Sequence, residues 1–306
     1  MKILIIGLGS IGKKHVDGIL NLYPEAQIYA LRTSNGSEEY KNVINIFSKN
    51  EIPSNIEFII ISNITSSHED TILEMINFGC PLFIEKPVIS NLKNAYEISN
   101  QLSKACIKTY VACNMRFHPS IEFIKNYIKT NSIRINEVNI YSGSFLPDWR
   151  PGNDFRNIYS ANKAMGGGVH LDLIHEMDYC CWIFGFPQSS KSIQLNRSSL
   201  KIDAIDSARY FLAYPDFSAS ISLNYFRRDA KRQIEIVAAD DTIVVDLLKN
   251  IVRCNLSNKV LFQSEFKIID TYTKQVGYFI NQIQSASEPM NNFENAIKVL
   301  KLAINE

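Results

Sequence analysis

The sequence predicts an α/β protein whose first half forms a doubly wound parallel sheet. Residues 2–6 form an isoleucine-rich apolar run, which is typical of a strand buried on both faces of a parallel sheet. A G-x-G-x-x-G motif follows this run directly, at Gly7, Leu8, Gly9, Ser10, Ile11 and Gly12. Further apolar runs alternate with helical patterns up to about residue 118, as in sheets built from strand–helix–strand units.

The glycines of the first turn predict a dinucleotide-binding loop. Gly7 permits the tight turn, Gly9 lets the backbone approach a pyrophosphate, and Gly12 lets the following helix pack close to the strand. That helix, predicted over residues 13–22, offers N–H groups and the positive end of its dipole to phosphates. Because the motif follows a buried strand, we prefer this interpretation to a glycine-rich turn without a ligand.

The length and composition of the chain limit the classes of protein to which it could belong. The 306 residues suggest about two domains. A net charge of +1 gives no bulk attraction to nucleic acid or membrane. The six cysteines show no C-x-x-C spacing, so neither a disulfide framework nor a metal site is expected. The strand pattern from residue 2 and the lack of a long apolar run predict a cytoplasmic protein without a signal peptide or membrane span.

The second predicted strand, residues 27–31, bears on the choice of cofactor. An acidic residue after it would bind the ribose 2′-hydroxyl of NAD, whereas an arginine accommodates the 2′-phosphate of NADP. The sequence there is Arg32, Thr33 and Ser34, with no acid. NADP is therefore favoured over NAD, although Arg32 could be a solvated loop charge.

Polar residues follow the next three predicted strands, residues 57–62, 81–84 and 109–113, with helices predicted over residues 68–79 and 92–104 between them. Ligands bind at the carboxyl edge of such sheets. We therefore expect this edge to supply further cofactor contacts, although a histidine at a helix start is more often structural. These candidate residues are Asn63, His68, Glu85, Lys86 and Asn114.

Several motifs, in the same order, give the chain a resemblance to the glucose–fructose oxidoreductase / inositol dehydrogenase / MocA (Gfo/Idh/MocA) family. They include the glycine motif with His15 behind it, His68 and the Glu85-Lys86-Pro87 segment. Residues 116–119 (RFHP) and 166–178 (GGGVHLDLIHEMD) complete the set, and the similarity covers essentially the whole chain.

The resemblance implies two domains: a Rossmann domain at residues 1–118 and an α/β domain with an open, mostly antiparallel sheet at residues 119–290. A C-terminal helix of about residues 291–306 would pack back on the first domain. The resemblance also implies NAD(P)-dependent hydride transfer, usually at a sugar or cyclitol carbon. It leaves room for a redox-neutral hydrolase or epimerase, for reduction of an unsaturated substrate such as biliverdin, and for a cofactor-sensing protein without chemistry.

The second-domain motif departs from the family pattern at one point. The family usually places an acid four residues before the histidine, whereas Asp172 and His175 are three apart. On the single helix predicted over residues 169–184, this spacing would still share a face. His175 is expected to be the catalytic base, and a catalytic role for Asp172 stays open.

A loop at residues 146–160 carries the expected substrate contacts. Aromatic rings there could stack on a sugar, and arginines could clamp a carboxylate or phosphate. Alternatively, the arginines pair with Asp148 and Asp154 and brace the loop. Together with Arg116, they suggest an anionic substrate. The candidate residues of the loop are Trp149, Arg150, Asp154, Arg156 and Tyr159.

The remaining pattern predicts a strand region over residues 132–145 and helices over residues 272–283 and 292–304. Successive strands over residues 190–201, 206–214, 217–226, 234–238 and 242–247 are expected to form a meander. Ile221, Leu223 and Tyr225 share one face of this sheet by their period of two. The other face would be bare, which predicts a homodimer or homotetramer packed through the sheet.

The resulting hypothesis is reversible oxidation of a secondary alcohol on a sugar-like ring. His175 would take the hydroxyl proton, because an unperturbed imidazole pKa of about 6.5 suits proton transfer near neutrality. Lys86 would stabilise charge on the same oxygen, unless it only pairs with Glu85. An anionic sugar or nucleotide sugar of surface-glycan biosynthesis is the expected substrate class.

Overall fold

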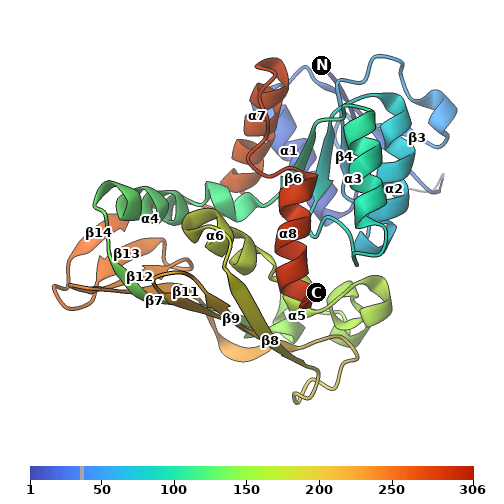
Figure 1. Cartoon of the computed structure of the whole chain (residues 1–306). Coiled ribbons are helices and arrows are strands. Elements are labelled where there is room, and N and C mark those ends of the chain that lie inside the picture. The colour runs from blue at the N-terminus through green and yellow to red at the C-terminus, as the bar shows by residue number, and fades with distance from the viewer. Residues whose placement is uncertain (35–37) are drawn as a thin grey trace. The chain divides into compact units, whose positions relative to one another are not determined.

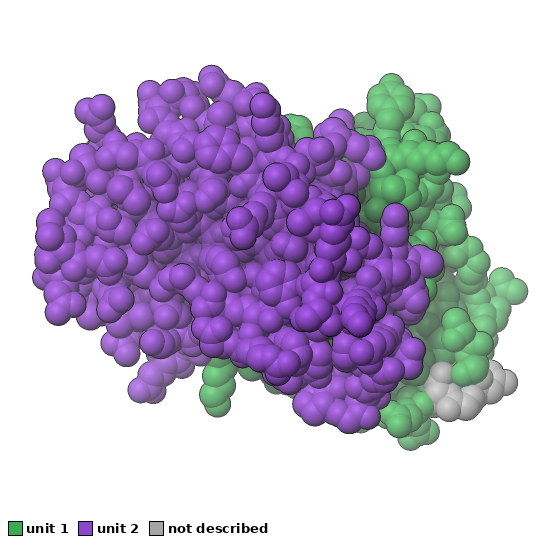
Figure 2. All heavy atoms as spheres, turned by 90° about the horizontal axis from the view of Figure 1, so that it is seen from below, with its two compact units in different colours: residues 1–114, 267–300 green, residues 115–266, 301–306 purple. Residues whose placement is uncertain are grey.

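The computed structural model describes residues 1–34 and 38–306, which form two compact units (Figure 1; Figure 2). Unit 1 comprises residues 1–114 and 267–300, and unit 2 comprises residues 115–266 and 301–306. In the part of the chain that the structure describes, no helix has both the length and the apolar character needed to cross a membrane.

Unit 1 contains a six-stranded sheet of order β3-β2-β1-β4-β5-β6, in which all neighbours run parallel. This confirms the doubly wound α/β fold, and the order reverses between β1 and β4, where such sheets bind ligands at their carboxyl ends. Only the short β3 is absent from the predicted set. The strands are β1 (Lys2–Ile6), β2 (Gln27–Leu31), β3 (Ile44–Ile46), β4 (Phe58–Ile61), β5 (Leu82–Glu85) and β6 (Thr109–Ala112).

The helices of unit 1 include one that the predicted domain boundary placed elsewhere. Residues 267–290, expected in the second domain, group with unit 1 because α7 packs on α1. The two helices approach closely at Gly18, where a Cβ would lie 3.2 Å from the backbone of Thr273. Phe279 of α7 adds ring contacts to Phe58 and Phe83 of the sheet. The helices are α1 (Ser10–Leu22), α2 (His68–Met75), α3 (Ala95–Lys104), α7 (Asp270–Gln284) and, up to Leu300, α8 (Phe293–Ile304).

Unit 2 contains an eight-stranded sheet of order β14-β13-β12-β11-β7-β10-β9-β8. Only β7 and β10 run parallel, so the sheet is mostly antiparallel, as expected. The last turn of α8 belongs to this unit, since the carbonyl of Ala303 accepts hydrogen bonds from Tyr210 and Gln194. The strands are β7 (Ile135–Phe145), β8 (Ser189–Leu195), β9 (Ser207–Ala213), β10 (Ser218–Asn224), β11 (Phe226–Ala238), β12 (Thr242–Asp246), β13 (Ile251–Cys254) and β14 (Val260–Gln263).

The predicted meander is wrong at one place, because β7 lies between β10 and β11. Only Tyr225 separates the end of β10 from the start of β11, so no turn is available to reverse the chain there. The two strands instead pair with opposite edges of β7. The short strands β13 and β14 extend the sheet beyond the predicted set.

One face of the sheet is buried, as the period-two pattern predicts. Ile221, Leu223 and Tyr225 are buried, and helices α4 (Pro119–Thr130) and α6 (His175–Phe184) lie over this face (Figure 1). The other face carries exposed apolar side chains, with Ile193 64% and Phe211 57% exposed.

The helix predicted over residues 169–184 is broken. It forms α5 (Val169–Asp172) and then α6, because Leu173 adopts φ −98° and ψ 30°. At the break, Ile174 donates to Leu171 and Glu176 to Leu173, so the hydrogen bonds step from i−4 to i−3. Asp172 and His175 therefore do not share one helical face.

Asp241, next to β12, gives a testable dependence of stability on acid. Its carboxylate accepts backbone N–H groups of Thr242, Leu256 and Ser257. These hydrogen bonds, led by that of Leu256, lower the pKa of Asp241 from 3.8 to about 2. Because the folded pKa is the lower one, this stabilisation is complete above about pH 4 and disappears as the pH falls toward about 2.

We therefore expect Asp241→Asn to be less stable than wild type at pH 6 and equal to it below pH 2. Urea unfolding of both proteins across this range measures the difference. A difference between the two proteins that stays constant from pH 6 to pH 2 would contradict the assignment.

Candidate functional site

The glycine turn after β1 forms an open cradle at the N-terminus of α1. Gly7 has a φ of 90°, and a Cβ on it would lie 2.3 Å from the backbone nitrogen of Asn63. A Cβ on Gly12 would lie 2.5 Å from the carbonyl oxygen of Gly7. Gly9, by contrast, has no neighbouring atom within 4 Å of where its Cβ would be. The helix has no side-chain N-cap and no acid in its first turn, so its N–H groups face this open side.

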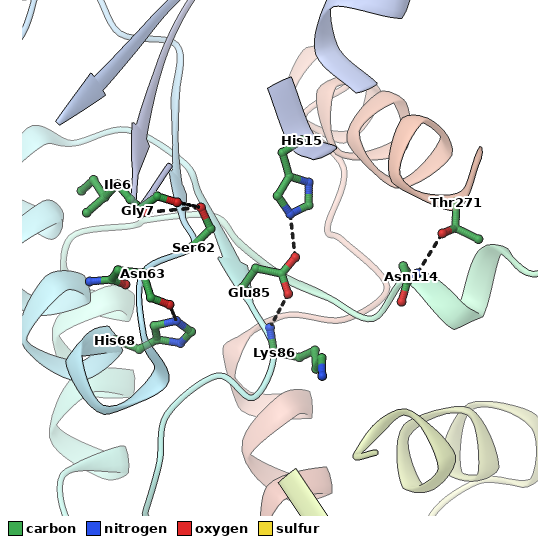
Figure 3. A network of polar contacts seen from close by, with 10 residues as sticks. All are labelled: Ile6, Gly7, His15, Ser62, Asn63, His68, Glu85, Lys86, Asn114 and Thr271. Atoms are coloured by element: carbon green, nitrogen blue, oxygen red, sulfur yellow. Dashed lines mark hydrogen bonds and ion pairs between the residues drawn. The ribbon is translucent and has the colours of Figure 1, made fainter. Parts of the chain in front are cut away.

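Ser62, after β4, locks the turn by donating from Oγ to the carbonyl of Gly7 at 2.9 Å (Figure 3). Around the cradle, Leu8 is buried, Ile11 is half-buried and Ser10 is exposed. An open glycine backbone at a helix N-terminus fits a pyrophosphate. The predicted phosphate-binding turn therefore has the geometry that a dinucleotide requires.

Arg32 follows β2 and is anchored rather than freely solvated. Its Nη1 donates to Oδ1 of Asn45 at 3.1 Å and to the carbonyl of Glu38 at 3.4 Å. Thr33 and Ser34, beside it, are exposed. The arrangement gives the end of β2 a fixed positive charge next to two hydroxyl groups.

His68, predicted to contact a cofactor, has a position that favours the structural alternative. The ring is buried, with Nε2 3.1 Å from the carbonyl of Asn63 and Nδ1 3.0 Å from that of Pro87. Burial lowers its pKa. The amide of Asn63 donates to Thr71 at 2.8 Å. His68 thus joins the loops that follow β4 and β5. This role depends on contacts with backbone carbonyl groups, which residue types do not reveal.

Glu85 and Lys86 end β5 at the same edge of the sheet as the glycine turn (Figure 3). Oε1 of Glu85 lies 2.6 Å from Nε2 of His15, and Oε2 accepts the backbone N–H of Lys86 at 3.1 Å. Lys86 itself is half-buried. After β6, Asn114 donates to Thr271 of α7 at 2.8 Å. The sequence marked His15 only as part of a motif, and its contact with Glu85 was not foreseen.

In unit 2, Asp172 at the end of α5 accepts a 2.5 Å hydrogen bond from the hydroxyl of Tyr225. Burial, followed by the charge of Asp172, raises the pKa of Tyr225 well above its ordinary value. Trp149 packs edge-on against the Tyr225 ring, with centroids 5.3 Å apart, and donates to Ser144. Tyr225 was predicted only as a core residue, yet it joins a loop aromatic to the acid beside α6.

His175 is the first residue of α6 and is half-buried. Two ion pairs hold this helix, and the second of them is buried on both sides. Arg232 of β11 donates to Glu176 at 2.6 Å. Arg116 donates from Nε and Nη2 to the two oxygens of Asp178, at 2.9 and 2.7 Å.

The pairing with Asp178 gives Arg116 a structural partner, whereas the sequence predicted contact with an anionic substrate. Both side chains are buried and the carboxylate matches the guanidinium in a bidentate pair. Through this pair, Arg116 fixes the helix that carries His175. The sequence could not show this because the two residues are 62 positions apart.

Breaking this pair is expected to destabilise the protein strongly. Asp178→Asn leaves the buried guanidinium of Arg116 without its countercharge, which costs about 3–5 kcal/mol in comparable cases. Replacing both residues, as Arg116→Met with Asp178→Leu, should recover much of that loss. Urea unfolding of Asp178→Asn, the double variant and wild type measures both effects, and a loss below about 1 kcal/mol for Asp178→Asn would contradict a buried ion pair.

Contacts within the loop at residues 146–160 hold part of it in place. Such bracing was the alternative that the sequence left open to substrate binding by the arginines. Asp154 accepts the backbone N–H of Arg156 at 3.0 Å and lies 3.4 Å from its guanidinium. Tyr159 donates to the carbonyl of Gly166 at 2.9 Å. Arg150 is exposed. Within the described residues, no group of three or more His, Cys, Asp or Glu side chains could hold a metal ion.

Comparison with known proteins adds a family match. The model of an oxidoreductase family with an NAD-binding Rossmann fold, GFO_IDH_MocA, matches residues 1–112. A myo-inositol 2-dehydrogenase of Thermotoga maritima is 21% identical over 324 aligned positions, covering 99% of this chain and 94% of that protein. A scyllo-inositol 2-dehydrogenase (NAD(+)) of Bacillus subtilis is 23% identical, covering 61% of this chain and 55% of that protein.

Solved structures share the whole fold. A UDP-N-acetylglucosamine 3-dehydrogenase from Acidithiobacillus ferrooxidans superposes with a TM-score of 0.81 at 17% identity, covering 100% of this chain and 96% of that one. The WlbA dehydrogenase from Bordetella pertussis, in complex with NADH and UDP-GlcNAcA, gives 0.79 at 18% identity, covering 100% and 94%. The resemblance that the sequence motifs indicated is confirmed.

Proposed function

Because the chain belongs to the Gfo/Idh/MocA oxidoreductase family, we propose that it reversibly oxidises a secondary alcohol of a sugar-like substrate with NAD(P). The single observation that carries the proposal is the fixed position of Lys86 at the carboxyl end of β5. The open glycine turn lies at the same edge of this sheet. This edge therefore offers both a phosphate cradle and a lysine.

The residues of unit 1 fit a nicotinamide dinucleotide. The backbone at Gly9, with Ser10 and Ile11 at the start of α1, would hold the pyrophosphate. Arg32, with Thr33 and Ser34, would hold the adenosine ribose, and its positive charge favours the 2′-phosphate of NADP over NAD. The bound nicotinamide supplies hydride exchange at its C4.

The protein's part in the chemistry is to hold the alcohol and move its proton. His175 would accept the hydroxyl proton as the carbon–hydrogen bond breaks and the carbonyl forms. The Lys86 ammonium would donate a hydrogen bond to the same oxygen and stabilise its developing negative charge. Asp172, held by Tyr225, would orient the ring through a second hydroxyl.

The substrate proposed is an anionic sugar or nucleotide sugar of surface-glycan biosynthesis. With Arg116 engaged by Asp178, the positive charge toward the substrate would come from Arg150 and Arg156. Trp149 would stack on the sugar. The inositol and UDP-sugar dehydrogenases among the relatives support a cyclic polyol or nucleotide sugar.

A substrate panel tests this function. Inositols, sugar acids and nucleotide sugars are each incubated with NAD or NADP, and the reduced cofactor is followed by its absorbance. We expect turnover with an anionic member and a lower KM for NADP than for NAD. Product formed without a net absorbance change would instead indicate a redox-neutral glycosidase or epimerase. Cofactor binding without any product would indicate a cofactor-sensing protein.

We also propose that the chain forms a homodimer or homotetramer through the exposed sheet face. Phe211 and Ile193 lie diagonally across β9 and β8 on this face, and Leu195 extends the apolar patch. Apolar patches of this kind mark interfaces.

Phe211→Glu should shift the oligomer toward monomer, because the new carboxylate would be buried in the interface. Position 211 pairs with Lys191 of the neighbouring strand β8, so the new carboxylate would face a lysine and the substitution should leave the sheet intact. Sedimentation velocity measures the shift, and Leu256→Glu, in an exposed loop, is the matched control. A wild-type monomer at micromolar concentration would contradict the proposal.

A further inference from the structure

We infer that the buried pair His15–Glu85 acts as a positioning device for Lys86. The inference rests on the proposed function, in which Lys86 contacts the reacting oxygen. The pair joins α1, which carries the phosphate cradle, to the end of β5, which carries the lysine (Figure 3). This role does not require His15 or Glu85 to bind the substrate.

His15 is held in one orientation and one tautomer. Its side chain is fully buried, and its ring packs against Phe83 at 4.9 Å and Tyr272 at 5.5 Å between centroids. Among the described residues, Nδ1 has no hydrogen-bond partner. A buried N–H there would cost its full desolvation, so the proton is assigned to Nε2, which donates to Glu85.

Glu85 connects that fixed ring to the backbone of Lys86. A buried carboxylate is costly unless hydrogen bonds satisfy it, and here each oxygen has a donor. Oε1 faces Nε2 of His15 at 2.6 Å, and Oε2 accepts the N–H of Lys86 at 3.1 Å. The second contact fixes the peptide plane that precedes the Cα of Lys86.

The chain is held on the other side of Lys86 as well. His68 lies within hydrogen-bond distance of the carbonyl of Pro87, at 3.0 Å. Lys86 therefore stands between two anchored positions, one from α1 and one from α2. Anchoring of this kind sets the direction in which its side chain leaves the sheet, and small misplacements of a catalytic group cost much of its rate effect.

Two substitutions of His15 separate positioning from stability. His15→Leu removes the donor to Glu85, whereas His15→Gln places an amide N–H where Nε2 stands. We expect His15→Leu to lower kcat about 10- to 100-fold with little change in KM, and His15→Gln to restore most of it. Phe58→Leu is the matched control, because it loosens the same core without touching Glu85.

A second readout does not depend on activity. Reductive methylation with ¹³C-formaldehyde labels lysines for NMR, and Lys86→Arg assigns the Lys86 signal. His15→Leu should shift this signal and its titration, whereas Phe58→Leu should not. An unchanged signal and a kcat within about twofold of wild type would overturn the inference while the proposed function stands. If wild type turns over no substrate, the proposed function fails, and the NMR signal still decides the positioning.

Discussion

We expect Lys86→Met to lower kcat about 10²- to 10³-fold and to leave cofactor binding nearly unchanged. This magnitude is typical for the loss of one preorganised donor to a developing oxyanion. Methionine keeps the length of the side chain but supplies no charge or hydrogen bond. Steady-state kinetics give kcat, and quenching of protein fluorescence by NAD(P)H gives the dissociation constant.

Lys93→Met, at an exposed position, is the matched control and should behave as wild type. Lys86→Arg should recover only part of the loss, because a planar guanidinium cannot occupy the position of the ammonium. Turnover within about threefold of wild type in Lys86→Met would show that Lys86 serves the structure of the β5 end and not the reaction.

His175→Asn removes the proposed base and should lower kcat about 10²- to 10⁴-fold. The asparagine keeps a polar side chain at the start of α6 but cannot accept the hydroxyl proton. The pH profile of kcat/KM should also lose the acid limb that protonation of an imidazole produces. Kinetics across pH 5–9 measure both effects.

His118→Asn is the control for His175. His118 accepts the N–H of Ser120 at the start of α4, and asparagine can cap the helix in the same way. This variant should keep both the rate and the acid limb. If His175→Asn kept the acid limb, another group would be the base.

The sequence predicted the strands and the glycine turn of unit 1 well, because short stretches of neighbouring residues determine them. The run at residues 2–6 and the three glycines after it require a buried strand, a tight turn and a close helix. Unit 2 was harder, because the position of β7 between β10 and β11 depends on pairing across about 80 residues of chain. The break after Asp172 depends on backbone angles at Leu173 that no residue type marks.

In the candidate site, too, features set by local sequence were predicted better than features set by long-range pairing. Residue type and position at a strand end were enough to select the glycine turn and Lys86. The ion pair of Arg116 was not predicted, because its partner Asp178 is remote in sequence and the charge of Arg116 alone suggested a ligand. The ring nitrogens of His68 contact backbone carbonyl groups, which every residue carries whatever its type. Long-range pairing decided these roles, and a single sequence does not display it.

A crystal structure with NADP and a turned-over sugar tests most directly whether Lys86 of unit 1 and His175 of unit 2 serve one reaction. The Lys86 ammonium and an imidazole nitrogen of His175 should each lie within about 3.2 Å of the same substrate hydroxyl oxygen. That oxygen should be on the carbon facing C4 of the nicotinamide. A hydroxyl bound with either group more than about 6 Å away would contradict the proposed dehydrogenase mechanism.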